Sequence, residues 1–528
     1  MSTTSAPVSG QSERHSAIDP ARRDRYRGLL AGALGAVAMV AAFILLRPFT
    51  NDVSVIDAIA DASLLAMPIS LFSTLLDTFG AQAKTLFLAG LVALLVLIGA
   101  GFGMQYARQT AGARRPVWPK IQAWAAGITV VLALFMLVVA GSETPDVMSG
   151  WNAVRSVVAV ALGAEAWAVV TALVLHLLRT RDAAAAIPAG PAIDRRRAIS
   201  LAAMAAVGVG AAAVIGREVQ RVATRKVVGT ESAGQLPPAI TPNDNFYVVS
   251  KNFMDPSPDR GADWSIEVGG LVDKPGTIGR AELEAIGAEE LVSTLTCISN
   301  EVGGNLISTA KWTGVPLATV LKRFGVRPNA VDLVAEGEDG YTDSFPVERA
   351  LSPEPHLVWQ MNGEPLPASH GTPVRLIVPG LYGIKNVKWL TKLTVSGDDY
   401  KGFWQDRGWT DVGIVKTKSQ FRVPRRGEVL TAGRHEIGGI AFAGDRGISK
   451  VEVSDDNGKT WHEATIAENP SDAGLSWVIW TDQWDATSGE HTLVVRATDG
   501  EGNPQPEEEA PTLPDGASGY HKVPVVVA

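Results

Sequence analysis

The sequence is short of cysteine. Cys297 is the single cysteine among 528 residues, so the chain cannot form an internal disulfide. The same count excludes an iron–sulfur cluster held by a set of cysteines from this chain. One thiol can still serve in packing, as a nucleophile, or as one soft ligand to a metal whose remaining ligands come from elsewhere.

The sequence also lacks the signals of several cofactor and nucleic-acid classes. The formal net charge is −8 and no dense basic stripe occurs, which argues against a nucleic-acid binder. There is no P-loop and no G-x-G-x-x-G motif at a strand-to-helix turn, so the usual nucleotide sites are absent. Of the eight histidines, only His176 lies within a long apolar run, and a haem held between two membrane helices is therefore not expected.

Charge is scarce over the first 216 residues, where long apolar runs recur. Each run approaches the ~20 residues that a helix needs to span the hydrocarbon core of a membrane. Buried helices of a large soluble domain are the alternative, but so many runs with so few charges would need an unusually large core. We therefore expect a membrane domain over residues 28–216 with about five helices, at 28–46, 85–104, 121–140, 157–178 and 198–216.

Positive charge is concentrated before the first run and in alternate connections between the runs. Membrane proteins keep Lys and Arg in their cytoplasmic loops, so this distribution predicts a cytoplasmic tail over residues 1–27 and an extracytoplasmic location for residues 217–528. The clusters are Arg22, Arg23, Arg25 and Arg27; Arg108, Arg114, Arg115 and Lys120; and Arg179, Arg181, Arg195, Arg196 and Arg197.

Three features of the membrane region leave alternatives open. The apolar stretch 63–80, interrupted by Asp77, is either an interfacial or re-entrant helix or a further span, which would invert the orientation. The arginines at 195–197 fit either a twin-arginine export signal placed inside the chain or an ordinary positive flank. Glu165, the one carboxylate within a run, is a functional-site candidate by default or a group that hydrogen-bonds a neighbouring helix.

From residue 217 the composition becomes that of soluble protein. Residues 217–240 contain Arg, Gly and Pro and are interpreted as a tether. Residues 241–411 mix short β-rich runs with helical stretches such as 316–324, which predicts an α+β domain without regular βαβ alternation. Residues 412–528 predict a β-sandwich, with the turn 455–459 between two strands. The stretches that favour strands there are 449–454, 461–466, 492–498 and 522–527.

Three segments of the expected α+β domain match motifs of a known family in their order along the chain. They are 294–317 (TLTCISNEVGGNLISTAKWTGVPL), 340–346 (GYTDSFP) and 359–390 (WQMNGEPLPASHGTPVRLIVPGLYGIKNVKWL). With these motifs the domain resembles the molybdopterin-binding domain of the sulfite oxidase family. The region 412–528, including its closing segment 519–523, resembles the immunoglobulin-like dimerisation domain that follows in that family.

The resemblance implies a set of site residues. The family's cysteine thiolate binds molybdenum beside a pterin dithiolene, and Cys297 stands at the matching position as metal ligand and catalytic residue. A soft thiolate suits such a metal, and fixed positive charge suits the pterin phosphate. Taken singly, the basic residues would be surface ion pairs and the histidine a loop hydrogen bond. The remaining cofactor-binding residues implied are Asn245, Tyr247, Asp339, His370, Arg375, Asn386, Val387 and Lys388.

The sequence departs from the family pattern near the expected substrate pocket. Sulfite oxidases carry arginines just after the Cys-x-x-Asn tetrad, whereas Glu301 and Val302 follow Asn300 here. The family's active-site tyrosine, expected after the Lys-Trp-Leu motif, has no match beyond Tyr400 or the nearby Trp409. Lys385 and Arg407 are candidates for restoring positive charge close to the metal.

The sequence as a whole predicts a membrane-anchored, multi-pass molybdenum-cofactor oxidoreductase with an extracytoplasmic catalytic domain. Its reaction would be two-electron or oxygen-atom transfer on a small-molecule substrate, with a separate electron carrier because no haem, iron–sulfur or flavin motif is present. A homodimer is implied by the resemblance alone. A sulfite oxidase or dehydrogenase in the strict sense and a cofactor-free membrane-tethered binding protein are the alternatives.

Overall fold

The computed structural model describes residues 19–50, 55–65, 83–113, 115–136, 150–185, 235–252, 264–471 and 473–528, with a few isolated positions between them. The chain divides into two compact units. The first holds the long N-terminal helices, and the second holds all the strands.

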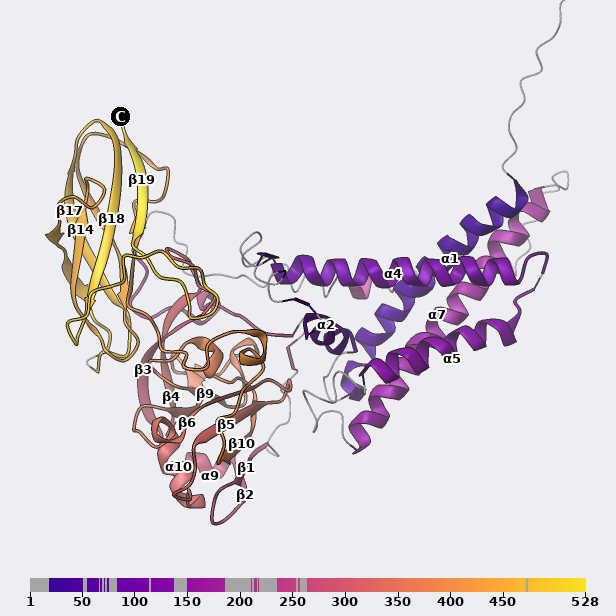
Figure 1. Ribbon diagram of the computed structural model, residues 1–528, viewed down its shortest axis with the longest axis horizontal. Coiled ribbons are helices and arrows are strands. Elements are labelled where there is room, and N and C mark those ends of the chain that lie inside the picture. The colour runs from indigo at the N-terminus through magenta and orange to yellow at the C-terminus, as the bar shows by residue number, and fades with distance from the viewer. Residues whose placement is uncertain are drawn as a thin grey trace, which may run out of the picture. The chain divides into compact units, whose positions relative to one another are not determined.

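The first unit is built from long helices (Figure 1). Four of them are long and apolar enough to cross a membrane, and they coincide with the first four predicted runs. The fifth run at 198–216, the arginines at 195–197 and most of the stretch 63–80 lie outside the described ranges. The four helices are α1 (Pro20–Leu45), α4 (Ala83–Gln109), α5 (Trp118–Phe135) and α7 (Gly150–Ala185). The short η1 (Arg47–Thr50) follows α1, whereas α2 (Val55–Leu65) belongs to the second unit.

Small residues and polar pairs hold these helices together. A Cβ atom on Gly32 of α1 would lie 2.2 Å from the carbonyl oxygen of Gly99 on α4, so the two backbones approach as closely as they do in small-residue membrane interfaces. Glu165 of α7 accepts a 2.7 Å hydrogen bond from Gln122 of α5. The carboxylate thus bonds a neighbouring helix, which is the second of its two sequence-based interpretations.

The α+β part of the second unit contains two layers of strands, one a mixed sheet and the other an antiparallel sheet. One sheet has the order β2-β1-β10-β5-β6, in which β1 and β10 run parallel, and the other has the order β3-β4-β7-β8 with β9 paired to β7. The first comprises β1 (Ser265–Gly270), β2 (Gly276–Gly279), β5 (Asp332–Gly337), β6 (Thr342–Pro346) and β10 (Leu390–Ser396). The second comprises β3 (Glu289–Thr296), β4 (Ile307–Pro316), β7 (His356–Met361), β8 (Glu364–Pro365) and β9 (Arg375–Ile377).

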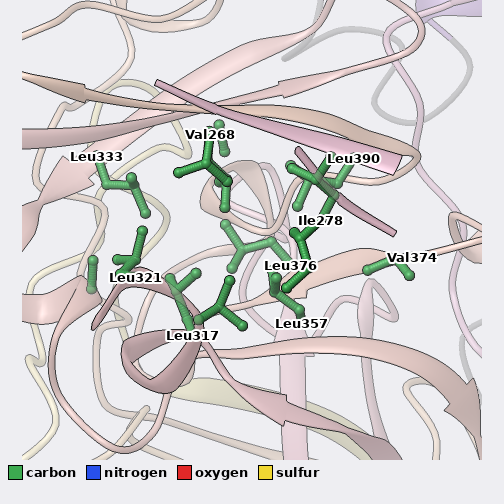
Figure 2. Close-up of a cluster of buried hydrophobic side chains, with 14 of the residues drawn as sticks. Val268, Ile278, Leu317, Leu321, Leu333, Leu357, Val374, Leu376 and Leu390 are labelled. Atoms are coloured by element: carbon green, nitrogen blue, oxygen red, sulfur yellow. The ribbon is translucent and has the colours of Figure 1, made fainter. Parts of the chain in front are cut away.

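Short helices close the core of this part. The helix α10 (Leu317–Phe324) places its apolar side chains at helical spacing and ends at Gly325, whose φ of +74° suits glycine. The helices α9 (Arg280–Glu284) and α11 (Val347–Ala350) are shorter. Figure 2 shows the side chains of α10 meeting those of both sheets, so one apolar core joins the two layers. This bears out the predicted α+β class.

The C-terminal part is made of strands in two sheets (Figure 1). Their orders are β11-β13-β17-β16 and β12-β19-β18-β14-β15, and one apolar cluster draws residues from both. The first contains β11 (Lys418–Val423), β13 (Gly433–Phe442), β16 (Thr465–Glu468) and β17 (Val478–Ala486). The second contains β12 (Val429–Leu430), β14 (Ile448–Ser454), β15 (His462–Glu463), β18 (Gly489–Asp499) and β19 (His521–Val527).

One predicted strand divides between the two sheets. The stretch 461–466 forms β15 up to Glu463 and β16 from Thr465, and the two pair with β14 and β17 respectively. The chain therefore changes sheets at Ala464, whose buried side chain joins the shared core. Local strand propensity indicates that a segment is extended but not which sheet it joins.

Candidate functional site

Cys297 lies at the first position of the loop between β3 and β4. Its backbone N–H donates to the carbonyl oxygen of Leu306 at 2.9 Å, which continues the pairing of the two strands by one residue. The side-chain oxygen of Asn300 accepts from the Leu306 N–H at 2.8 Å. These bonds close the base of the loop and fix the position of the cysteine.

The thiol of Cys297 is buried but not inert. Cys297 is 7% exposed, and its Sγ atom lies 3.0 Å from Oγ of Ser299. Burial raises the pKa of the Cys297 thiol, whereas the hydroxyl of Ser299 and the charge of Lys418 act in the opposite direction. Lys418 belongs to β11 of the C-terminal part, and its Nζ atom lies 5.3 Å from the ring centroid of Tyr382. Burial lowers the pKa of Lys418 to about 8.

A cleft opens beside Cys297. Residues from six separate stretches of the chain line it, so the site depends on the tertiary fold. The lining residues are Phe246, Tyr247, Val248, Val249, Ser250, Lys251, Leu295, Cys297, Asp339, Tyr341, His370, Arg375, Gly383, Ile384, Asn386, Val387, Lys388, Trp389 and Trp404.

Stacked rings form one wall of the cleft. The rings of Phe246 and Tyr247 stack with centroids 5.5 Å apart, and Phe246 also meets Trp312 and His370 edge-on. Burial raises the pKa of the Tyr247 hydroxyl well above its usual value, so this phenol is neutral at physiological pH. The wall is therefore rigid and mostly apolar, with a polar tip at Tyr247.

Cationic side chains are held inside the cleft by backbone carbonyls. Arg375 on β9 donates to the carbonyl oxygens of His370 (3.0 Å) and Asn386 (3.2 Å). Lys388 donates to Oγ of Ser250 (2.7 Å) and to the carbonyl oxygen of Ser369 (3.2 Å). Together with Lys251, these cations place positive charge in the cleft beside the carboxyl group of Asp339, and such charge suits an anionic ligand.

These cations also set the protonation of their neighbours. Burial, together with the charges of Arg375 and Lys388, lowers the pKa of His370 to about 3, so its imidazole is neutral at physiological pH. Burial alone lowers the pKa of Arg375 to about 10, which leaves it charged at neutral pH. Burial raises the pKa of Asp339, which Lys251 and Lys388 partly oppose.

A turn rich in small and polar residues brings the last lining residues to the cysteine. Oδ1 of Asn386 accepts from the N–H of Val378 at 2.7 Å, and its amide donates to the carbonyl oxygen of Tyr382 at 3.0 Å. These bonds fold 381–388 against β9. A Cβ atom on Gly383 would lie 2.8 Å from the hydroxyl of Tyr247 and 3.8 Å from Cα of Cys297, so glycine keeps the cleft open there.

The structure brings together the residues that the motifs singled out, with one difference. Tyr247, Cys297, Asp339, His370, Arg375, Asn386, Val387 and Lys388 all line the cleft, but Asn245 is not among the lining residues. Asn245 ends the short η4 helix (Asn243–Asn245), just before the two stacked rings.

The sequence reasoning missed several residues of the site. Tyr341 lies within the quoted motif GYTDSFP, so that motif could have identified it, and its hydroxyl bonds Asp343 and the carbonyl oxygen of Ile384. Lys251 lies only four residues after Tyr247. Lys418 had no sequence signal, because it reaches the cysteine from the other domain.

The two cations proposed to replace the family's arginines are engaged elsewhere. Nζ of Lys385 lies 2.8 Å from Oδ1 of Asp343, with both side chains at most 1% exposed. The guanidinium of Arg407 stacks 3.6 Å from the ring centroid of Phe403. Trp409 belongs to an apolar cluster with Tyr382, and Tyr400 bonds Thr342 through its hydroxyl.

Comparison with known proteins identifies the fold that holds this cleft. The profile described as oxidoreductase molybdopterin binding domain matches residues 254–404, and that of the Mo-co oxidoreductase dimerisation domain matches 412–527. Sulfite oxidase of Gallus gallus is 30% identical over 322 residues, which cover 52% of this chain and 69% of that protein. The chain belongs to the sulfite oxidase family.

Other members of the sulfite oxidase family match over similar regions. The mitochondrial sulfite oxidase of Drosophila melanogaster is 29% identical, with 54% of this chain and 59% of that protein covered. The chain spans 50 to 59% of the length of the mouse, human and fly enzymes. Among solved structures, the sulfane dehydrogenase SoxCD from Paracoccus pantotrophus matches at 27% identity and a TM-score of 0.45, covering 51% of this chain and 75% of that one.

The cleft fits the molybdenum–molybdopterin cofactor that this family binds. Nε of Arg375 is buried and has no hydrogen-bond partner within the described part of the chain, so it is available to an anionic group. The thiol of Cys297, a soft ligand for such a metal, lines the same cleft as Arg375.

Proposed function

We propose that this chain is a membrane-anchored molybdenum-cofactor oxidoreductase that acts on a small substrate outside the cytoplasm. The observation that carries the proposal is the cleft in which the buried thiol of Cys297 and the basic side chains of Arg375 and Lys388 line one space. When bound, the cofactor supplies two-electron chemistry, with or without transfer of an oxygen atom. The protein contributes binding, orientation and electrostatics.

The residues of the cleft divide into those that hold the metal and those that hold the pterin. Cys297 is the metal ligand and the catalytic residue. Arg375, whose pKa of about 10 leaves it charged at neutral pH, and Lys388 would bind the anionic end of the pterin from the wall of the cleft. The neutral ring of His370 and the polar groups of Tyr247, Asp339, Asn386 and Val387 line the pterin itself. Asn245 remains a cofactor contact only through the family resemblance.

The surroundings of Cys297 prepare its thiol for metal binding. A metal ligand must be deprotonated, yet burial favours the protonated thiol. The hydroxyl of Ser299 donates to the sulfur in its anionic form, and the positive charge of Lys418 favours the same form. Both groups therefore lower the cost of keeping a buried thiolate.

Lys418 also favours an anionic substrate. The family's arginines after the tetrad are replaced by Glu301, which is exposed, so its charge is screened by solvent. Lys418 provides positive charge near the sulfur from the C-terminal domain. Lys418→Met should raise KM for an anionic substrate about tenfold or more, with the loss largest below pH 8 where the amine is charged. An unchanged KM would contradict this assignment.

Domain limits and location complete the proposal. The limits are a cytoplasmic tail at 1–27, a membrane domain at 28–216, a tether at 217–240, a catalytic domain at 241–411 and a C-terminal domain at 412–528. Four apolar helices and the alternation of positive clusters support a multi-pass anchor with the catalytic domain outside. Export of a folded, cofactor-loaded domain would account for the arginines at 195–197.

Membership of the same family supports a proposal for the partners of the chain and for the fold of the C-terminal domain. Its two sheets around one core support an immunoglobulin-like sandwich, and the match to a dimerisation domain supports a homodimer. A separate electron carrier is required because the chain has no haem, iron–sulfur or flavin motif.

Metal analysis tests the proposal. The purified full chain should contain molybdenum, and Cys297→Ser should lose most of it, while Ser471→Ala, a buried serine of the C-terminal domain, should retain it. Sulfite, sulfoxides, N-oxides and nitrate are then screened with artificial electron acceptors and donors. Wild-type protein without molybdenum, purified from a cofactor-producing host, would instead support a cofactor-free binding protein. Rapid sulfite-dependent reduction of an acceptor would support the strict sulfite oxidase.

A further inference from the structure

We infer that the C-terminal domain positions the metal-ligand loop of its own chain, and that His521 is the positioning residue. This role is separate from the dimerisation for which the family domain is named. The inference rests on the proposed function only in taking Cys297 as the metal ligand. It concerns the loop 297–306, which joins β3 to β4.

The imidazole of His521 is fixed by its own strand neighbour. His521 begins β19, and its Nδ1 accepts a 3.0 Å hydrogen bond from the backbone N–H of Phe421 on β11. An Nδ1 that accepts carries no proton, so the ring is neutral with its proton on Nε2, and burial lowers the pKa of His521 to about 4, which agrees with a neutral ring at physiological pH. The opposite edge of the ring, Nε2, is therefore directed away from β11.

That edge of the ring packs directly on the ligand loop. A Cβ atom on Gly303 would lie 2.3 Å from Nε2 and 2.5 Å from Cδ2 of His521, so the ring occupies the space that any side chain at 303 would need. Gly303 has a φ of +75°, a conformation that glycine adopts at little cost. The loop tip at Gly303 and the ring of His521 are therefore in direct contact, with no room for a side chain at position 303.

Two further contacts hold the same loop from the C-terminal domain. The buried amide of Gln420, next to Phe421 on β11, donates to the carbonyl oxygen of Gly304 at 3.0 Å. At the start of the loop, the N–H of Trp477 donates to Oγ1 of Thr294 at 2.8 Å. The strand that leads into Cys297 and the turn that follows it are both attached to the second domain.

The arrangement has a physical consequence for the cysteine. The bonds of Cys297 and Asn300 with Leu306 close the base of the loop within the catalytic domain. The tip at 303–304 is held by His521 and Gln420 across the domain boundary. Loss of the His521 contact should therefore increase local opening of the loop, and exposure of the thiol, without unfolding either domain.

The single cysteine of the chain provides a direct probe. We would measure the rate of alkylation of Cys297 by iodoacetamide in the cofactor-free full chain in detergent, produced in a host that makes no cofactor. His521→Asn places Oδ1 where Nδ1 stood and retains the Phe421 bond, but it removes the edge that packs on Gly303. His521→Gln instead retains a nitrogen at the position of Nε2. The matched control is His435→Asn, whose ring bonds the carbonyl oxygen of Thr431.

The expected pattern separates positioning from general stability. His521→Asn should be alkylated about tenfold faster than wild type, whereas His521→Gln and His435→Asn should stay within about threefold, since local opening scales with the lost contact. The thermal midpoints of the two His521 variants should be similar. Equal alkylation rates for wild type and His521→Asn would overturn the inference, as would an equal acceleration in His435→Asn.

A second pair of variants covers the case in which His521→Asn fails to fold. Gly303→Ala should accelerate alkylation because its methyl group collides with the ring, and adding His521→Ala should remove part of that effect. Strictly additive effects would contradict direct packing between the two residues. The assays use no cofactor, so they remain decisive if metal analysis rejects the proposed function, and the molybdenum content of holo His521→Asn reports whether positioning matters for loading.

Discussion

At the scale of single residues, buried cations in and near the cleft differ in their partners. Some donate to backbone carbonyl oxygens, and others pair with a carboxylate. Arg375 donates to two backbone carbonyl oxygens, which leave its positive charge available to an anionic ligand. Lys385 lies two residues before Val387. Its charge is neutralised by Asp343, and it also contacts Asp411. Its role is to support the turn that carries the lining residues 383–388.

The buried pair of Lys385 and Asp343 yields a prediction on stability. Lys385→Met should destabilise the chain by about 3 to 5 kcal/mol, because it leaves the carboxylate of Asp343 buried without its cation. The double variant Lys385→Met with Asp343→Asn should recover much of this loss. The measurement is the free energy of unfolding in urea. A single variant as stable as wild type would contradict the assigned ion pair.

At the scale of secondary-structure elements, close approach of strands depends on particular glycines. Gly314 of β4 lies where the register with β7 shifts, and a Cβ atom there would lie 2.0 Å from the carbonyl oxygen of Leu357. A Cβ atom on Gly276, at the start of β2, would have its nearest neighbour, Cε1 of Phe324, at 3.7 Å, which is ordinary van der Waals contact. Both glycines lie in strands and only Gly314 is crowded, so the two positions can be compared as a test and its control.

Gly314→Ala should therefore cost much more than Gly276→Ala. The first must push β4 away from β7 and is expected to destabilise by about 3 kcal/mol, whereas the second should change stability by less than about 1 kcal/mol. Thermal unfolding followed by tryptophan fluorescence measures both. Similar midpoints for the two variants would show that β4 and β7 do not pack as described.

The same elements show what the sequence can and cannot predict. The helix α10 and the strand β18 were predictable because their apolar spacing is regular. Most of the cleft was predictable because its residues lie in a few ordered motifs. The division of 461–466 between two sheets was not, nor was the approach of Lys418 and His521 to the cysteine loop, because these follow from how the domains pack and not from any local pattern.

At the scale of the whole molecule, buried neutral histidines make stability depend on pH. Burial, together with Arg422 and Arg426, lowers the pKa of His521 from 6.5 to about 4. Between these values the unfolded chain binds a proton that the folded chain does not, so stability falls as the pH is lowered through this window and is unaffected above it.

This linkage predicts a difference between wild type and His521→Gln. From pH 7 to pH 4 the wild type should lose about 3 kcal/mol more stability than the variant, since glutamine has no proton to take up. Other titrating groups contribute equally to both and cancel in the comparison. The test is urea unfolding of the cofactor-free chain at each pH, and parallel pH profiles would contradict a buried neutral His521.

The central claim is that the sulfur of Cys297 binds molybdenum in the cleft bounded by Arg375 and Lys388. X-ray absorption at the molybdenum edge of the purified full chain tests it most directly. In the fraction of Cys297→Ser that retains molybdenum, the sulfur shell should have one scatterer fewer than in wild type, while Ser299→Ala keeps the wild-type shell. An identical sulfur shell in wild type and in this fraction of Cys297→Ser would show that Cys297 does not bind the metal.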